Sequence, residues 1–174
     1  LNGDSYDDVL TVSISAAAEV WANNGDGSFT NNQSIGTIYT RALALGDLDS
    51  DGDLDLFVGE YGPANRVWIN LGGDQLGVEG EFSDSGQQLF SPENATVEVD
   101  LGDLDNDGDL DAWISNTVGD GNTVWLNDGL GFFVDSGQTL GAYSSESTAL
   151  GDLDNDGDLD AYVANADAPD RVWL

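Results

Sequence analysis

The sequence predicts an all-β fold made of repeated four-stranded units, and two landmarks that recur in register predict it. The acidic segment at residues 46–55 returns at 102–111 and 151–160, with Asn in place of Ser50, and a degenerate copy lies at residues 2–8. A Val-Trp pair follows the last Asp of every copy, with Trp21, Trp68, Trp125 and Trp173 each 13 or 14 residues downstream. Such self-similarity is typical of repeat architectures.

The landmarks divide the chain into about 3.5 units, at residues 1–45, 46–101, 102–150 and an incomplete 151–174. In the second unit, strand-like runs at 54–59, 66–71, 81–90 and 95–101 are separated by Gly and Pro turns. Four strands in roughly 50 residues is the count of a β-propeller blade. The continuously apolar run at 56–58 predicts a strand buried on both faces. Residues 13–18 are expected to form a loop, because they occupy the turn position of the repeat.

The charge of the chain excludes whole classes of partner. It carries 34 acidic residues against three Arg and no Lys, for a formal net charge of −31. Nucleic acids and anionic membranes are bound by clustered basic side chains, so neither is expected as a partner. No apolar stretch approaches the roughly 20 residues that span a bilayer, and no leader segment is recognisable at residue 1. With 40% hydrophobic residues, the chain is nevertheless expected to fold.

The absence of three residue types limits the kinds of metal site and cross-link that the chain can form. The 174 residues include no Cys, His or Met, so any metal must be held by oxygen and disulfides are excluded. Each full acidic segment reads Asp-x-Asp-x-Asp-Gly-x-x-Asp, a spacing in which alternate side chains of a tight loop can converge on one hard cation. Two carboxylates about 4 Å apart repel by about 4 kcal/mol at an effective dielectric of 20, and a divalent ion reverses that sign.

Details of the loop favour one metal and exclude one alternative. Gly52, Gly108 and Gly157, at the sixth position, permit the positive φ that a sharp turn requires. A site with many protein oxygens favours Ca²⁺ over Mg²⁺, which keeps several waters. An EF-hand would need Glu at the twelfth position, where Val58 and Ile114 stand instead. A solvated acidic turn without metal is the remaining alternative.

These loops, together with the Val-Trp-Leu-Asn-Asp-Gly-x-Gly-Phe segment at 124–132, resemble the FG-GAP/VCBS repeats of integrin-like calcium-binding β-propellers. The resemblance implies antiparallel four-stranded blades, an extracellular or cell-surface setting, and Ca²⁺ in the loop that joins successive units. It implies side-chain ligands at loop positions one, three, five and nine and a carbonyl ligand at position seven. These are Asp47, Asp49, Asp51, Asp55 with the Asp53 carbonyl; Asp103, Asp105, Asp107, Asp111 with the Asp109 carbonyl; and Asp152, Asp154, Asp156, Asp160 with the Asp158 carbonyl. In the first copy, Asn2, Asp4, Asp8 and the Tyr6 carbonyl form a partial fourth site.

Propellers of this kind commonly have about seven blades, so the sequence is expected to be an excerpt of a longer chain, a part of a closed oligomer, or a unit that assembles head to tail into a filament. Two sequons, at Asn32 and Asn94, are candidate N-glycosylation sites. Arg66 and Arg171 precede equivalent Trp residues by two positions and are expected to stack on them or to pair with nearby Asp residues.

The Trp side chains are expected to pack between sheets, with a sugar-stacking platform as the alternative. No carboxylate pair outside the metal loops recurs, so no catalytic residue is predicted. The leading interpretation is a non-catalytic extracellular Ca²⁺-binding scaffold whose partners are proteins, glycans or further copies of itself. The alternative is a glycan-binding propeller or an accessory module of a secreted enzyme.

Overall fold

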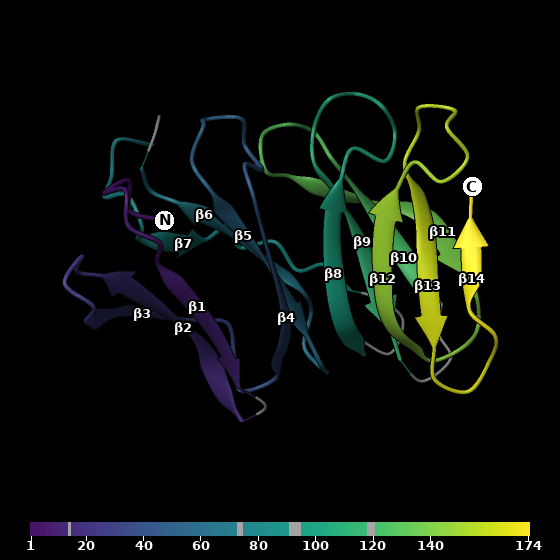
Figure 1. Cartoon of the computed structure of the whole chain (residues 1–174), viewed down its shortest axis with the longest axis horizontal. Coiled ribbons are helices and arrows are strands. Elements are labelled where there is room, and N and C mark those ends of the chain that lie inside the picture. The colour runs from purple at the N-terminus through teal and green to yellow at the C-terminus, as the bar shows by residue number, and fades with distance from the viewer. Residues whose placement is uncertain (14, 73–74, 91–94, 118–120) are drawn as a thin grey trace.

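The chain folds into four antiparallel sheets. Figure 1 shows the computed structural model, which describes residues 1–174 apart from 14, 73–74, 91–94 and 118–120. Two sheets have four strands, in the orders β4-β5-β6-β7 and β8-β9-β10-β11, and two have three, β1-β2-β3 and β12-β13-β14. The elements of the described residues are 14 β-strands, which confirms the all-β prediction. The strands are β1 Val9–Ser13, β2 Ala16–Asn23, β3 Phe29–Ile35, β4 Thr40–Gly46, β5 Asp55–Glu60, β6 Arg66–Asn70, β7 Phe82–Asp84, β8 Thr96–Gly102, β9 Asp111–Asn116, β10 Asn122–Asn127, β11 Phe133–Leu140, β12 Ser145–Gly151, β13 Asp160–Asn165 and β14 Arg171–Trp173.

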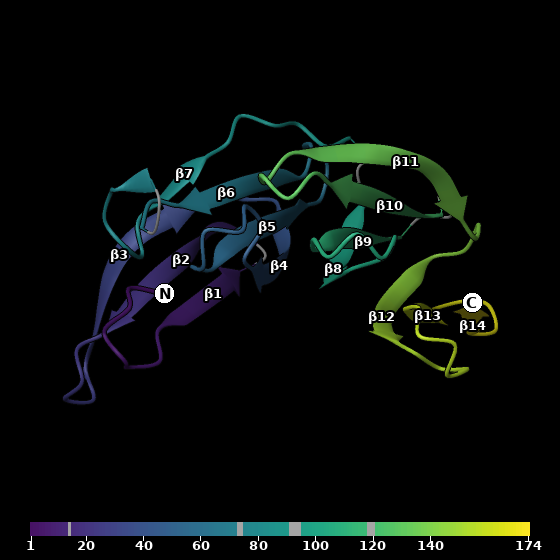
Figure 2. The same cartoon turned by 90° about the horizontal axis from the view of Figure 1, so that it is seen from above.

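The sheets follow one another in chain order along an arc that does not close, as part of a propeller would (Figure 2). Strands β4, β8 and β12 begin their sheets, and β8 contacts both of the others. Each of these first strands comes from the end of one sequence unit, whereas the following strands come from the next unit. The acidic loops therefore connect the first two strands of a single sheet.

The second strand of each four-stranded sheet is the most deeply buried element. Every residue of β5 and β9 is buried, as their apolar runs predict. These strands lie between two hydrogen-bonded neighbours, so their backbone groups are satisfied while both faces pack on adjacent sheets. Burial of continuous apolar strands is thus what stacks the sheets.

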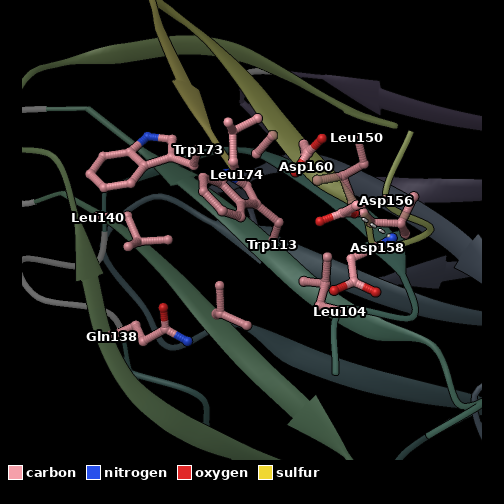
Figure 3. Close-up of a pocket in the computed structure, with 13 residues that line it drawn as sticks. Leu104, Trp113, Gln138, Leu140, Leu150, Asp156, Asp158, Asp160, Trp173 and Leu174 are labelled. Carbon is pink, nitrogen blue, oxygen red and sulfur yellow. Dashed lines mark hydrogen bonds between the residues drawn. The ribbon is translucent and has the colours of Figure 1, made fainter. Parts of the chain in front are cut away.

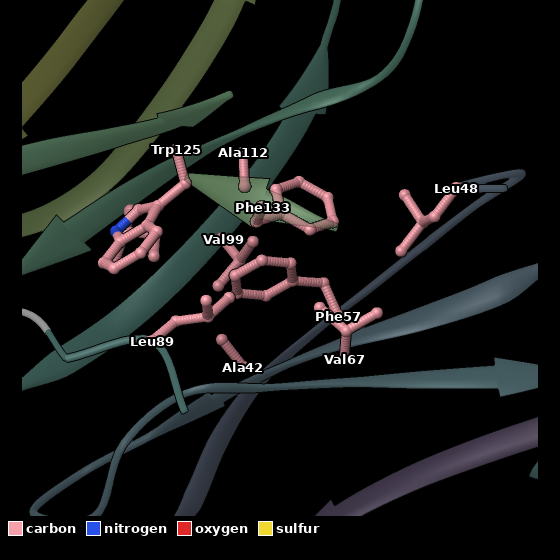
Figure 4. Packing of buried hydrophobic residues seen from close by; sticks show 10 residues of the cluster. Ala42, Leu48, Phe57, Val67, Leu89, Val99, Ala112, Trp125 and Phe133 are labelled. Carbon is pink, nitrogen blue, oxygen red and sulfur yellow. The ribbon is translucent and has the colours of Figure 1, made fainter. Parts of the chain in front are cut away.

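The hydrophobic core is divided among the three junctions between neighbouring sheets. The middle junction holds Phe57 of β5 against Phe133 of β11, with ring centroids 5.3 Å apart and planes at 83° (Figure 4). Edge-to-face rings at this distance are a favourable aromatic arrangement. Trp125 packs in this junction, Trp68 in the one before it, and Trp113 and Trp173 in the one after it. Packing between sheets is therefore the role of these four Trp side chains.

Two expected elements differ in the structure. Residues 13–18 were expected to form a loop, but Ser13 ends strand β1 and residues 16–18 begin strand β2. Ser13 pairs directly with Ala16, so the connection is shorter than in the other sheets. The strand expected at 81–90 is limited to Phe82–Asp84. Gly86 has φ +81°, and its N–H donates to Asp84 Oδ1 over 2.8 Å, so a turn ends the strand there.

Candidate metal centre

The three complete acidic loops share one backbone conformation. Gly52, Gly108 and Gly157 have φ of +97°, +100° and +101°, which confirms the turn expected at the sixth position. The fourth position is also left-handed, with φ of +62° at Ser50 and +63° at Asn106 and Asn155. Asn adopts this region more readily than most residues, which suits its presence there. Two left-handed residues in each loop fold the chain tightly enough for its Asp side chains to face one another.

Each loop brings together the carboxylates of its first, third and ninth positions. In every loop one oxygen from each of the three side chains lies within 4.8 Å of the others, forming the clusters Asp47, Asp49, Asp55; Asp103, Asp105, Asp111; and Asp152, Asp154, Asp160. The fifth-position residues lie outside these clusters. Asp51, Asp107 and Asp156 instead each accept a hydrogen bond, over 2.9–3.0 Å, from the N–H two residues later.

The ninth-position Asp fixes the second and third loops to their sheets. Asp55 is fully buried at the start of β5, where its two oxygens accept the N–H groups of Leu48 over 2.9 Å and Asn70 over 2.8 Å. Asp111 repeats both contacts, to Leu104 over 2.8 Å and Asn127 over 2.8 Å. These bonds orient the carboxylate and tie the loop to the third strand of the same sheet.

A side-chain amide then ties the first and second loops to the next sheet. Asn127 Nδ2 donates to the Leu48 carbonyl over 2.8 Å, which joins β10 to the preceding acidic loop. Asn70 Nδ2 donates in the same way to the Leu1 carbonyl over 3.2 Å. The conformation of these two loops is therefore coupled to the junction between two sheets.

In the second loop, the surroundings disfavour the ionised forms of three side chains, Asp49, Asp53 and Asp55. Burial, reinforced by neighbouring carboxylates of which Asp51 and Asp49 act most strongly, raises the pKa of Asp53 to about 6. Burial likewise raises the pKa of Asp55 to about 6, against its two backbone hydrogen bonds. One oxygen of Asp49 and both of Asp53 are buried without a hydrogen-bond partner. A cation held by Asp47, Asp49 and Asp55 would satisfy the Asp49 oxygen.

Ionisation of the carboxylates is also disfavoured in the third and fourth loops, to a lesser degree. Burial, followed by the charges of neighbouring Asp residues, raises the pKa of Asp109 and of Asp154. Burial also raises the pKa of Asp111. All-oxygen donor sets with clustered, partly desolvated carboxylates suit a hard divalent cation, so the residues present fit Ca²⁺.

The first loop has a related conformation but a weaker donor set. Gly3 and Ser5 hold the two left-handed positions, with φ of +71° and +74°. Asn2 Nδ2 donates a hydrogen bond to Asp4 Oδ2 over 3.1 Å. The Leu1 nitrogen lies 2.9 Å from one oxygen of Asp8, and the Asn23 N–H donates to the other oxygen over 2.9 Å. Tyr6, whose carbonyl was the remaining expected donor, gives its N–H to Asp4 over 2.9 Å. Of these residues, the structure brings none into a cluster of three acidic side chains.

The remaining candidates from the sequence take varied positions. Arg66 pairs with Asp84, with Nη1 and Oδ2 2.7 Å apart, whereas Arg171 lies over the ring of Tyr143, 5.1 Å from its centroid. Asn32 is exposed on β3, and Asn94 lies outside the described residues.

Sequence reasoning missed the Gln side chains that bridge neighbouring sheets. Gln33 Nε2 donates to the Phe82 carbonyl over 2.6 Å, and Gln33 Oε1 accepts the Phe82 N–H over 2.8 Å. Gln87 repeats this bridge with Gly131 and Phe133. The signal was present, because Ser-Gly-Gln recurs at 85–87 and 136–138.

Fold and site together define a class: a module of antiparallel four-stranded sheets with a repeated acidic loop between the first two strands. The FG-GAP-like repeat profile matches residues 1–58 and 47–114, and the chain belongs to that family. It is 29% identical over 104 residues to cartilage acidic protein 1 of Xenopus tropicalis, covering 56% of this chain and 15% of that protein. It is 27% identical over 101 residues to the Homo sapiens protein of that name, covering 54% and 14%. The match thus spans only about one seventh of these relatives.

The part of the chain that the structure describes contains no helix with the length and apolar character needed to cross a membrane.

Proposed function

We propose that this chain is a non-catalytic Ca²⁺-binding repeat module that acts as an extracellular structural or adhesive scaffold. The observation that carries the proposal is the threefold repetition of one donor set, Asp at positions one, three and nine, at the same place in three successive sheets. A hard cation with six to eight oxygen ligands matches this chemistry. The setting is supported by the similarity to a relative whose name refers to cartilage.

The proposed role of the ion is mechanical. Asp47, Asp49 and Asp55 would hold it in the second loop, with equivalent residues in the third and fourth, and it would supply positive charge where carboxylates now repel one another. Asp55 leads directly into a fully buried strand, and the Leu48 carbonyl accepts a hydrogen bond from the next sheet. Ordering the loop would therefore stiffen both a sheet and its junction, which is what a load-bearing or adhesive surface requires.

Calcium titration calorimetry on the Ca²⁺-free chain tests the proposal. We expect three bound equivalents, falling to two in each of Asp49→Ala, Asp105→Ala and Asp154→Ala. Asp167→Ala is the matched control, because Asp167 is exposed and outside the loops, and it should leave three equivalents. A fourth equivalent that Asp4→Ala removes would add the first loop. Absence of saturable binding at millimolar Ca²⁺, the range of weak extracellular modules, would contradict the proposal.

A further inference from the structure

The second, third and fourth acidic loops contact one another in sequence along the arc of sheets. Leu110, at the eighth position of the third loop, packs against Gly46, which directly precedes the second loop; a Cβ added to Gly46 would lie 2.7 Å from Leu110 Cδ1. Leu159 of the fourth loop packs in the same way against Gly102, which directly precedes the third loop, again with 2.7 Å between Cδ1 and an added Cβ. A change in one loop can therefore reach its neighbour directly.

Three buried hydrogen bonds join a candidate ligand of the second loop to a candidate ligand of the third. The Leu48 N–H donates to Asp55 Oδ2 over 2.9 Å, and the Leu48 carbonyl accepts a hydrogen bond from Asn127 Nδ2 over 2.8 Å. The Asn127 N–H then donates to Asp111 Oδ1 over 2.8 Å. Asp55 and Asp111 each belong to the carboxylate cluster of their own loop. Asn127 thus holds the orientation of Asp111 while it is anchored to the second loop.

A different contact joins the third and fourth loops. Asn106, the left-handed residue at the fourth position of the third loop, donates from Nδ2 to Asp158 Oδ1 over 2.8 Å. Asp158 is the seventh-position residue of the fourth loop, and Figure 3 shows it with Leu104 of the third loop at the border of one cavity. The second loop has Ser50 where the third has Asn106, and within the described part of the chain this shorter side chain makes no hydrogen bond to Asp109.

An ion in one loop would order groups that the neighbouring loop also uses. Leu48 lies between the first and third positions of the second loop, so an ion held there would fix the Leu48 carbonyl and, through Asn127, the carboxylate of Asp111. Conformational entropy lost when the first ion binds is not lost again when the second binds, so the second binds more tightly. By linkage the effect is reciprocal.

Repulsion between the bound ions opposes this effect. Charges in exposed loops are largely screened beyond about 8 Å at 0.15 M salt, whereas interactions between buried groups are screened much less. The hydrogen bonds through Asn127 are buried. We therefore expect the structural link to exceed the repulsion between ions.

We propose that Ca²⁺ binding to neighbouring loops is positively cooperative, with Asn127 coupling the second and third loops and Asn106 coupling the third and fourth. The inference rests on the proposed function, because it requires Ca²⁺ in these loops. Asn127 and Asn106 are positioning residues, which act on the ions through Asp111 and Asp158. Coupling between the second and third loops is the stronger, because its link is buried and the Asn106 contact is exposed.

The test compares loops that fill together with the same loops filled singly. Asp49→Ala, Asp105→Ala and Asp154→Ala empty the second, third and fourth loops, alone or in pairs, and Asp4→Ala is present throughout to remove the first loop. Competition with a chromophoric Ca²⁺ chelator measures the binding constants. The coupling factor of two loops is the overall constant for filling both, divided by the product of the constants of the two single loops.

The expected factors differ among the three pairs of loops. We expect at least about fivefold for the second and third loops and about two- to threefold for the third and fourth. The second and fourth loops are separated by the third, so their factor should be about one. This pair is the control for effects of the substitutions on the net charge.

Asn127→Ala should reduce the factor of the second and third loops to about one. Asn122→Ala is the matched control, because Asn122 is also buried, at the other end of β10, where its Oδ1 accepts the Asn116 N–H over 3.1 Å. It should lower the thermal midpoint and leave the coupling factor unchanged. An equal loss of coupling in both variants would overturn the assignment to Asn127.

Two exchanges at the fourth position test the other link. Asn106→Ser should reduce the factor of the third and fourth loops to about one, and the exposed site should allow this variant to fold. Ser50→Asn introduces the equivalent amide beside Asp109 and should raise the factor of the second and third loops about twofold. Unchanged factors in both variants would overturn the role of Asn106.

The outcomes separate this inference from the proposed function. Three bound equivalents with factors of about one for both neighbouring pairs would overturn cooperativity and leave the proposed function intact, whereas absence of saturable binding would overturn both. A factor below one that approaches one at 1 M salt, where the screening length is about 3 Å, would identify repulsion between the ions and would also overturn the inference.

Discussion

Replacing Asp100 with Asn should stabilise the protein at neutral pH and have no effect in acid. Asp100 lies on β8, where one carboxylate oxygen is buried without a partner. Burial, with a contribution from the charge of Glu98, raises its pKa to about 6 from an ordinary 3.8. The side chain therefore favours the folded state when protonated, so its contribution is complete below about pH 4 and is lost as the pH rises through about 6.

The magnitude follows from the shift. About 2 pKa units correspond to about 3 kcal/mol, and partial exposure of the side chain reduces this to about 1–2 kcal/mol at pH 7.5. Urea unfolding followed by Trp fluorescence between pH 4 and 8 measures it. The gain should be the same with and without Ca²⁺, because Asp100 is outside the acidic loops. Asp135→Asn, at an exposed site on β11, is the matched control and should leave the free energy of unfolding at pH 7.5 unchanged. A gain at pH 7.5 that persists at pH 4 would refute the reasoning, because burial of charge could not then be its cause.

Three further variants probe the loops and junctions through urea or thermal unfolding. Gly108→Ala should cost about 1–2 kcal/mol, because its φ is +100° while no atom lies within 4 Å of an added Cβ; Gly151→Ala, equally open but without a positive φ, should cost under about 0.5 kcal/mol. Phe57→Ala should cost about 3–5 kcal/mol by opening a cavity beside Phe133, and an effect under 1 kcal/mol would contradict the core assignment. Asn127→Ala should lower the free energy of unfolding by about 1–3 kcal/mol, because it leaves the carbonyls of Leu48 and Leu110 without this donor, and it should also weaken Ca²⁺ binding. Unchanged Ca²⁺ affinity would show that the loop and the junction between sheets are not coupled.

The repeated landmarks predicted most of the fold because they encode local geometry. The apolar runs at β5 and β9 are buried on both faces, and the loop Gly residues take the left-handed conformation, as their sequence context indicates. Spacing alone could not show that the sheets beginning with β4, β8 and β12 take their first strand from the preceding unit. That depends on hydrogen bonding between segments on either side of the acidic loop, and the repeat period is the same wherever the unit is taken to begin.

The candidate site was less completely predictable. The sequence identifies which Asp residues belong to each loop, but the structure separates the clustered Asp47, Asp49 and Asp55 from Asp51, which caps its own turn. The Gln bridges were missed because a polar residue on an outer strand looks like an ordinary solvated position. Only the partner strand, 49 residues away for Gln33 and Phe82, gives it a function.

Thermal unfolding of the Ca²⁺-depleted chain, with and without added Ca²⁺, is the most direct test of the central claim that the acidic loops bind calcium. At a free concentration one hundred times the dissociation constant, each site adds about 2.7 kcal/mol, so three sites add about 8 kcal/mol. For a chain of this length the account predicts a rise in the thermal midpoint of at least about 15 °C. Mg²⁺ at the same concentration should produce much less. An identical midpoint in saturating Ca²⁺ and in chelator would contradict the account.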